Sequence, residues 1–181
     1  MKEFMRRGGW VFLAVLFVGT ALVGGIYALV SNSGSSNPSS SYINCPTKSV
    51  TAKQEKVKGK LQGAELAGFT PVNSVSYLQC WDLKIGNGAT ATATSTVTAH
   101  YTGALAKTGV IFQSSLDSGQ PFSAQLSGGV IPGWSAGIPG MKVGGTRRLL
   151  IPSQYAYGSQ SVGGIPPNSD LVFDVTLLAV K

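Results

Sequence analysis

The sequence has few of the residues on which most enzyme chemistry depends. His100 is the only histidine, Cys45 and Cys80 are the only cysteines, and charged residues make up 12% of the chain. Because no Cys-x-x-Cys pair or histidine cluster occurs, the usual ligand sets for a metal are missing. His100 has no evident acid partner, and Ser114 and Ser115 lack the sharp strand-to-helix turn of a nucleophilic serine. We therefore expect a structural histidine, no metal site, no cofactor and no hydrolase chemistry.

Acidic residues are also scarce, with 7 Asp and Glu against 14 Lys and Arg, so the formal net charge is +7. Part of this excess lies in residues 1–7 and much of the rest in a lysine cluster between Lys48 and Lys60. No aromatic residues alternate with these lysines, which argues against nucleic-acid binding. A solvated basic face is the simplest interpretation, and attraction to an anionic envelope surface is the alternative.

Charge is absent from residues 8–30, where the only long hydrophobic run of the chain occurs. A helix of this length crosses about 30 Å of hydrocarbon, and Trp10 and Tyr27 lie near its two ends. Basic residues precede the run and none lies between residues 31 and 47, which predicts a cytoplasmic N-terminus and an extracytoplasmic remainder. The alternative is a protein secreted after signal-peptide cleavage, although no convincing small-x-small site follows the run.

Composition divides the chain into five predicted parts: a basic N-terminus (1–7), a transmembrane anchor (8–30), a Ser/Gly-rich linker (31–41), an extension (42–74) and a domain (75–181). The extension is expected to pack loosely against the domain and to include a short helix around residues 53–66. Cys45 of the extension and Cys80 of the domain either form a disulfide or remain two independent thiols.

From residue 75 onward, alternating apolar residues and turn signals predict strands. We expect them at residues 75–85, 90–105, 110–112, 121–126, 146–151 and 171–180. Between them, Gly128-Gly129-Val130-Ile131-Pro132-Gly133-Trp134 predicts the start of a short helix, with proline in its first turn. Because this helix contains glycines and Pro139, packing must hold it. One helix against a mostly antiparallel sheet gives an α+β fold.

Within that helix, Ile131 and Trp134 are three residues apart and therefore share a face. Gly133 places no side chain beside the indole of Trp134, which would leave the indole surface open to a ligand. The alternative is that Trp134 is an ordinary core residue and that the glycines are turn residues.

Several motifs of this domain occur in the order and spacing of one known family. They are His100-Tyr101-Thr102-Gly103, Phe112-Gln113-Ser114-Ser115, Pro121-Phe122, Val130-Ile131-Pro132-Gly133-Trp134, Gly140-Met141, Tyr155-Ala156-Tyr157-Gly158, Ile165-Pro166-Pro167-Asn168 and Leu171-Val172-Phe173-Asp174-Val175. The domain resembles the FKBP-type peptidyl-prolyl cis-trans isomerases over residues 75–181. The resemblance implies a twisted antiparallel β-sheet wrapped around one short α-helix, with a pocket between them.

The resemblance also implies the residues of the site. The catalytic positions would be Tyr101, Phe112, Ile131, Trp134, Tyr157 and Phe173, and the other substrate-binding positions would be Gln113, Phe122, Val130 and Ile165. In this reading Trp134 lies under the proline ring, while the Ile131 N–H and the Tyr157 hydroxyl contact the carbonyl of the rotating bond.

By the same resemblance, the protein is a peptidyl-prolyl cis-trans isomerase that acts on X–Pro bonds of proteins folding outside the membrane. The implied partners are proline-containing polypeptides and macrolide inhibitors of the FK506/rapamycin type. The alternative is a binding or chaperone module with little or no catalysis.

Three departures from the family pattern bear on catalytic strength and macrolide affinity, and not on the fold. The family commonly has Asp where this chain has Gln113, whose amide can still reach Tyr101. Gly129 leaves the position before Val130 without a side chain. The loop between Gly158 and Ile165 is one residue short and lacks a histidine.

Overall fold

The computed structural model describes residues 60–181. The predicted N-terminus, anchor and linker, and Cys45 with them, lie outside the described residues. Within residues 60–181 there is no helix whose length and apolar character would allow it to span a bilayer.

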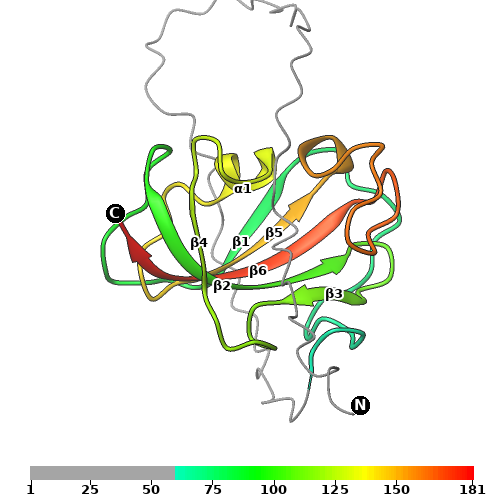
Figure 1. Cartoon of the computed structure of the whole chain (residues 1–181), viewed down its shortest axis with the longest axis horizontal. Helices are drawn as coiled ribbons and strands as arrows, with labels where there is room; N and C mark the ends of the chain where they lie inside the picture. Colours follow the sequence, from blue (N-terminus) through cyan, green and yellow to red (C-terminus); the bar gives the residue numbers. More distant parts are fainter. Residues whose placement is uncertain (1–59) are drawn as a thin grey trace, which may run out of the picture.

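Six strands form a single antiparallel sheet in the order β1-β5-β6-β2-β3, with β4 pairing to β2 (Figure 1). The strands are β1 (Gln79–Lys84), β2 (Thr96–Leu105), β3 (Ile111–Ser114), β4 (Phe122–Gln125), β5 (Thr146–Ile151) and β6 (Leu171–Val180). A short helix α1 (Pro132–Gly137) lies between β4 and β5, and a 3₁₀ turn η1 (Ser153–Tyr155) follows β5. The predicted antiparallel sheet with one short helix is confirmed.

The longest ladder joins β2 to β6, from Val97 opposite Val180 to Leu105 opposite Leu171. Burial alternates over Thr96–His100 of β2 and Phe173–Leu177 of β6, where one face of the sheet is covered, and it is continuous over Tyr101–Ala104 of β2, where both faces are covered. β6 follows the last turn and enters the middle of the sheet between β5 and β2. The C-terminal segment therefore completes the fold.

Helix α1 is short, and its own side chains do not cap either of its ends. Its N-cap residue, Ile131, makes no side-chain capping bond, and no basic residue lies in its last turn. Arg147 of β5 supplies the missing group, because its guanidinium donates to the carbonyl oxygens of Gly137 (2.9 Å) and Pro139 (3.2 Å). Asp82 of β1 holds that guanidinium through Nε and Nη2, at 2.6 and 3.1 Å. As expected, packing and not propensity fixes this helix.

The role expected for Gly133 is wrong. A Cβ at this position would lie 2.5 Å from Cγ2 of Ile151, so the glycine faces β5 and not a ligand. Gly137, four residues later, faces Leu149 of the same strand. The two glycines let α1 approach the sheet closely, and this approach sets the height of Trp134 above the sheet.

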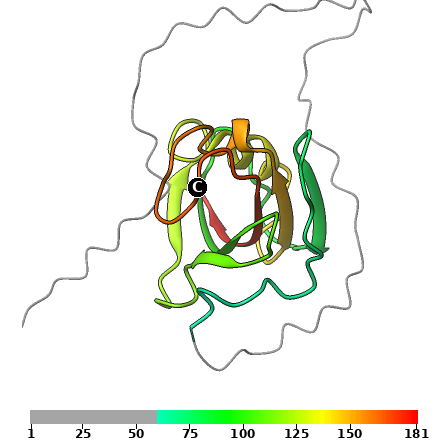
Figure 2. The same cartoon turned by 90° about the vertical axis from the view of Figure 1, so that its right-hand side faces the viewer.

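Two groups of buried side chains form the core. The larger group lies between α1 and the sheet and includes Trp134, Phe173, Leu126, Ile138 and Leu177. Figure 2 shows the sheet curving around this interior. The smaller group contains Ala104, Ala106, Ile111, Leu150 and Val172, packed with Leu66 and Val75 from the N-terminal side of the domain.

Residues 60–75, here called the N-terminal clasp, pack more closely than the loose extension that was expected. Their predicted helix is absent from residues 60–66, which form turns and an isolated bridge between Glu65 and Val110. The clasp is fixed by the Asp117 carboxylate, which accepts the N–H groups of Leu61 (2.6 Å) and Gln62 (3.0 Å).

Arg148 fixes the middle of the clasp. Its guanidinium donates to the carbonyl oxygens of Gly68 (2.6 Å) and Ala67 (2.9 Å), and it pairs with Asp174 of β6 at 2.6 Å. The Arg148 side chain is 6% exposed, so the pair is largely removed from water. This part of the predicted extension is an integral part of the folded domain.

Candidate active site

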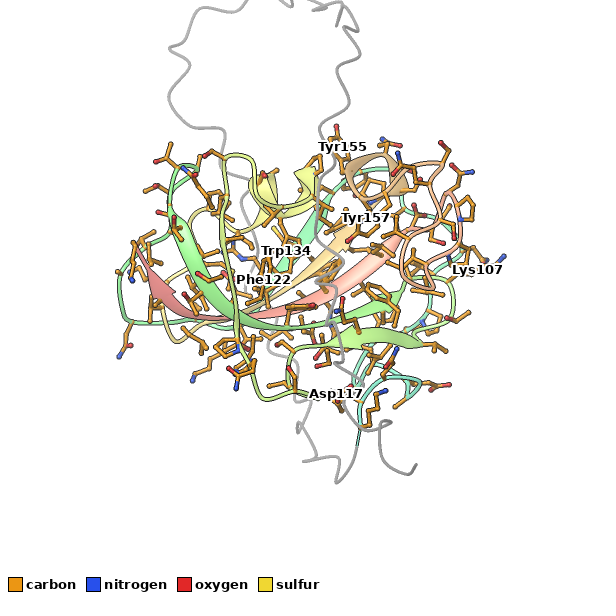
Figure 3. All side chains as sticks on the ribbon, viewed as in Figure 1. Lys107, Asp117, Phe122, Trp134, Tyr155 and Tyr157 are labelled. Carbon is orange, nitrogen blue, oxygen red and sulfur yellow. The ribbon has the colours of Figure 1, made fainter. Side chains whose placement is uncertain are left out.

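Trp134 lies at the centre of a cluster of aromatic rings beneath α1. Its side chain is fully buried, and its ring centroid is 5.6 Å from those of Tyr101 and Phe173 and 6.0 Å from that of Phe122. All three contacts are edge-to-face, with interplanar angles of 79–87°. This geometry is favourable for aromatic pairs and fixes the rings relative to one another. Figure 3 shows Trp134 and Phe122 close together in the interior.

The other rings of the cluster come from strands that are far apart in the sequence. Tyr101 lies on β2, Phe112 on β3, Phe122 on β4 and Phe173 on β6. Tyr101, Trp134 and Phe173 are buried, whereas Phe112 and Phe122 are half-buried and form the outer part of the cluster. A buried floor with a partly exposed rim is the arrangement that an apolar ligand needs.

A glycine on β2 allows part of this cluster to close. A Cβ at Gly103 would lie 2.6 Å from Cζ of Phe112 and 2.6 Å from Cε1 of Phe173. These two rings instead meet edge to face, with centroids 5.7 Å apart. A larger residue at position 103 would separate the rings, so this glycine is a part of the site that the sequence analysis did not identify.

Three aliphatic side chains surround the rings. Val130, Ile131 and Ile165 are 4%, 1% and 1% exposed and belong to the same buried group as Trp134. Ile131 precedes α1 in an extended conformation, and its carbonyl accepts the N–H of Trp134 at 2.9 Å. Among the described residues its own N–H has no hydrogen-bond partner. An N–H that is left free at the start of a helix is a ready donor to a ligand carbonyl.

The indole is a second unpaired donor. Within residues 60–181, Trp134 Nε1 is the one buried side-chain nitrogen or oxygen without a hydrogen-bond partner. Most buried polar groups are satisfied, so an exception calls for an explanation. Here the indole is fixed by its edge-to-face contacts with Tyr101, Phe122 and Phe173 and not by a hydrogen bond from its nitrogen.

The two tyrosine hydroxyls of the site stay protonated at all physiological pH values. Burial raises the pKa of Tyr101 to about 12. Burial also raises the pKa of Tyr157 to about 12, with a further contribution from the charge of Tyr101. A charge on Tyr101 would raise the cost of ionising Tyr157 further, so the two phenols lie near each other. Both are thus neutral groups that can donate hydrogen bonds.

Gln113 differs from its expected arrangement. It is half-buried on β3, opposite Gly103 of β2. Within the described part of the chain, no hydrogen bond joins its amide to the Tyr101 hydroxyl, although that contact was expected to replace the family's carboxylate. The site therefore lacks both the negative charge and the tether that an Asp would supply at this position.

His100 lies beside the site and takes part in hydrogen bonds that fix the backbone of β2. Its Nδ1 is 3.0 Å from Oγ of Ser115, and the same oxygen accepts the N–H of Tyr101 at 2.9 Å. Ser114 Oγ pairs with Thr102 at 2.9 Å. These hydroxyls join β2 to the end of β3, in agreement with the structural role expected for His100.

The structure brings together nearly all of the predicted site residues around Trp134. The buried group and the side chains packed against it include Tyr101, Phe112, Phe122, Val130, Ile131, Ile165, Tyr157 and Phe173. Cys80, which was expected either to pair with Cys45 or to remain a free thiol, belongs to the same buried group. Cys80 is buried on β1, and since Cys45 is outside the described residues the pairing stays a prediction.

Sequence analysis did not identify the buried ion pairs that fix the elements around the site. Arg147 and Arg148 occupy consecutive positions in a buried strand, and this signal alone predicts two buried ion pairs because buried guanidinium groups need partners. Their partners, Asp82 and Asp174, are fixed only by strand register.

The curled antiparallel sheet, its single short helix and the aromatic cluster at their junction define an FKBP-like domain. The chain belongs to the FKBP-type peptidyl-prolyl cis-trans isomerase family, whose model matches residues 88–178.

Particular relatives show the extent of this similarity. The chain is 42% identical over 137 residues to "FK506-binding protein 4" of Emericella nidulans and to "Peptidyl-prolyl cis-trans isomerase" of Saccharomyces cerevisiae. Each match covers 75% of this chain, but only 28% and 31% of those longer proteins.

Two solved structures are also similar. AtFKBP13 is 36% identical with a TM-score of 0.54, and the match covers 60% of this chain and 96% of that one. FkpA from Escherichia coli is 42% identical with a TM-score of 0.54, and the match covers 61% and 53% of the two chains.

Proposed function

We propose that this protein catalyses cis-trans isomerisation of X–Pro bonds in polypeptides that fold outside the membrane. One observation carries the proposal: a fully buried tryptophan, ringed by aromatic side chains, lies three residues after a backbone N–H that has no partner in the described part of the chain. The first group suits a proline ring and the second suits the carbonyl of the bond to be rotated.

The reaction makes modest demands on a protein. Rotation about a peptide bond crosses a barrier of about 18–20 kcal/mol because amide resonance is lost. The twisted transition state separates less charge than the planar amide does, so an apolar environment disfavours it less than water does. No nucleophile, metal or proton carrier is needed, and each tenfold gain in rate requires about 1.4 kcal/mol.

The site residues supply this differential stabilisation. The aromatic cluster provides a rigid apolar surface for the proline ring, with Trp134 as its buried floor and the half-buried Phe112 and Phe122 at its rim. The Ile131 N–H and the Tyr157 hydroxyl hold the carbonyl oxygen in its rotated position. Because burial keeps Tyr157 protonated to about pH 12, it remains a donor throughout the physiological range. Contacts made only in the twisted state raise the catalytic rate.

The test is an isomerisation assay on the full-length chain, with peptides that differ in the residue before proline. We expect the fastest turnover with apolar residues, because the site is lined by aromatic rings and has no acidic side chain at Gln113 or Gly129. Tyr157→Phe serves as a control that keeps the ring and removes the hydroxyl, and it should lower kcat/KM. Rates equal to the uncatalysed rate for every peptide at saturating enzyme would exclude the enzymatic function.

A binding or chaperone module is the second candidate. The absence of both a carboxylate and a Gln113–Tyr101 hydrogen bond favours it, since substrate binding can survive where catalysis is weak. Proline peptides and FK506-type macrolides, which the names of the fungal relatives point to, would then bind without rate acceleration.

The location is part of the proposal. We propose that residues 8–30 anchor the protein with its N-terminus in the cytoplasm, because basic residues precede this uncharged run and none follows closely. Protease added to intact cells should remove the domain and leave a small membrane fragment. A protected domain would invert the topology, and spontaneous release of the domain would indicate a cleaved signal peptide.

A further inference from the structure

The loop that presents Tyr157 is built around one residue, Ser153. The Ser153 carbonyl accepts the N–H groups of Ala156 at 3.0 Å and Gly158 at 2.9 Å, the two neighbours of Tyr157 in the chain. Gly158 in turn accepts the N–H of Asn168 at 2.7 Å. The position of Ser153 therefore determines where the Tyr157 backbone lies.

Ser153 itself is held by a carboxylate from the other end of the loop. Asp170 Oδ1 accepts the Ser153 N–H at 2.8 Å. The Asp170 backbone carbonyl accepts the N–H of Ala106 at 2.9 Å, which fixes Asp170 to the residue after β2. Asp170 precedes β6, and Ser153 follows β5, so this bond closes the loop at the base where it leaves the sheet.

The second oxygen of the Asp170 carboxylate accepts a hydrogen bond from a different part of the chain. Asp170 Oδ2 accepts the N–H of Val75 at 2.7 Å. Val75 is the last residue of the N-terminal clasp, and its side chain is 7% exposed in the smaller core group. The clasp thus fixes one oxygen of Asp170, and the other oxygen fixes Ser153.

We propose that Asp170 is a positioning residue for Tyr157: its carboxylate, oriented by Val75 of the clasp, holds Ser153 and thereby places the Tyr157 hydroxyl at the substrate carbonyl. The expected effect of Asp170 on the isomerisation rate rests on the proposed isomerase function. Its expected effect on the position of Tyr157 does not. Within residues 60–181, Asp170 makes no polar contact with the aromatic cluster, so it acts on Tyr157 only through Ser153.

The chemistry requires a carboxylate at this position. Two backbone N–H groups converge on two oxygens, and an ionised carboxylate offers acceptors only. An amide at position 170 would satisfy one N–H and turn an NH₂ group toward the other. Asp170→Asn should therefore retain part of the positioning, and Asp170→Ala should retain none.

The chain offers a matched control in Asp117. Its carboxylate also accepts two backbone N–H groups of the clasp, those of Leu61 and Gln62. Its carboxylate makes no hydrogen bond to the Tyr157 loop among the described residues, and Figure 3 shows Asp117 near the lower edge of the domain, with Tyr157 well above it. Asp117→Ala removes the same kind of interaction at the start of the clasp, while Arg148 still holds residues 67 and 68.

The experiment compares wild type, Asp170→Ala, Asp170→Asn and Asp117→Ala as full-length chains. Three quantities are measured: kcat and KM with one proline peptide, the free energy of unfolding, and the titration of Tyr157 by NMR of ring-labelled tyrosine, assigned with Tyr157→Phe. We expect Asp170→Ala to lower kcat/KM by at least about tenfold, the scale of a lost hydrogen bond to a charged group. The Tyr157 pKa should fall from about 12 toward its ordinary value as the ring becomes more solvated.

Asp170→Asn should give an intermediate loss, and Asp117→Ala should leave kcat/KM within about twofold and the Tyr157 titration unchanged. The inference is overturned if Asp170→Ala leaves the Tyr157 titration at the wild-type value, or if both alanine variants lower kcat/KM equally. Should Asp170→Ala fail to fold, Asp170→Asn provides the same comparison. If the wild type has no isomerase activity, the proposed function fails, while the Tyr157 titration still decides the role of Asp170.

Discussion

Replacing Gly133 by alanine tests whether the close approach of α1 to β5 positions Trp134. An exposed helical glycine replaced by alanine gains about 1 kcal/mol of stability from helix propensity. Here the new Cβ would lie 2.5 Å from Cγ2, 2.8 Å from Cδ1 and 3.0 Å from Cγ1 of Ile151. Contacts this short force either the helix or the strand to move.

Ile151 cannot move away at low cost. It is fully buried on β5, and branching at Cβ restricts rotation about its first side-chain torsion. Overpacking of a core costs about 1–3 kcal/mol, and subtracting the gain of about 1 kcal/mol from helix propensity leaves a net cost of up to about 2 kcal/mol. We therefore expect Gly133→Ala to lower the free energy of unfolding by up to about 2 kcal/mol. Because Trp134 is the next residue, kcat/KM should fall as well.

Gly137→Ala is the matched control on the same helix. Its Cβ would meet Leu149 Cδ2 at 2.7 Å, which is the far end of a more flexible side chain, so the cost should be smaller. Urea unfolding and the peptide assay measure both effects, and the double variant Gly133→Ala with Ile151→Ala should recover at least about 1 kcal/mol relative to additivity. If Gly133→Ala is as stable and active as the wild type, the contact with Ile151 does not fix the helix and the reasoning fails.

Three further predictions concern charged and titrating groups. Gln113→Asp should tighten FK506 binding about tenfold by restoring a charged acceptor; unchanged affinity by calorimetry would refute this. Since burial raises the pKa values of Tyr101 and Tyr157 from 10 to about 12, their stabilising contribution is present below pH 10 and is lost as pH rises toward 12; the corresponding phenylalanine variants should lose that part of the pH dependence of the free energy of unfolding, measured by urea unfolding between pH 10 and about pH 12, and an unchanged slope would refute this. Arg147→Met should cost about 3 kcal/mol in urea unfolding by leaving Asp82 unpaired; adding Asp82→Leu should restore part of it, and no restoration would refute the ion-pair explanation.

Local pattern predicted the sheet well where a strand is bounded by turns and buried on both faces. The spans 146–151 and 171–180 agree with β5 and β6 to the residue. The first strand begins at Gln79 and not at residue 75, because the Val75 N–H is taken by Asp170 and its side chain fills the smaller core group. The second begins at Thr96, since residues 92–95 form a turn closed by Ser95 and Thr92.

The candidate site was predictable as a set of residue types but not as a geometry. Aromatic motifs in family order indicated which side chains surround Trp134, whereas the free Ile131 N–H depends on how the chain enters α1. The direction of Gly133 toward Ile151 and the loss of the Gln113–Tyr101 contact depend on strand register and helix height. The contacts of Asp170 with Ser153 and Val75 join residues that are far apart in the sequence. They depend on how the strands are arranged in the sheet, which a local sequence pattern does not reveal.

The N-terminal clasp also has a consequence for the solubility of the folded chain. β3 ends one side of the strand order, and an end strand presents unpaired backbone groups that can recruit a strand from another molecule. The clasp occupies this edge: Gly63 donates to Ile111 (2.8 Å), Ile111 donates to Ala64 (2.8 Å) and Leu66 donates to Gly109 (2.8 Å). A fragment that begins at residue 88, where the family match begins, would uncover both this edge and the apolar face beneath it. The same short segment therefore protects the sheet from intermolecular strand pairing and aggregation.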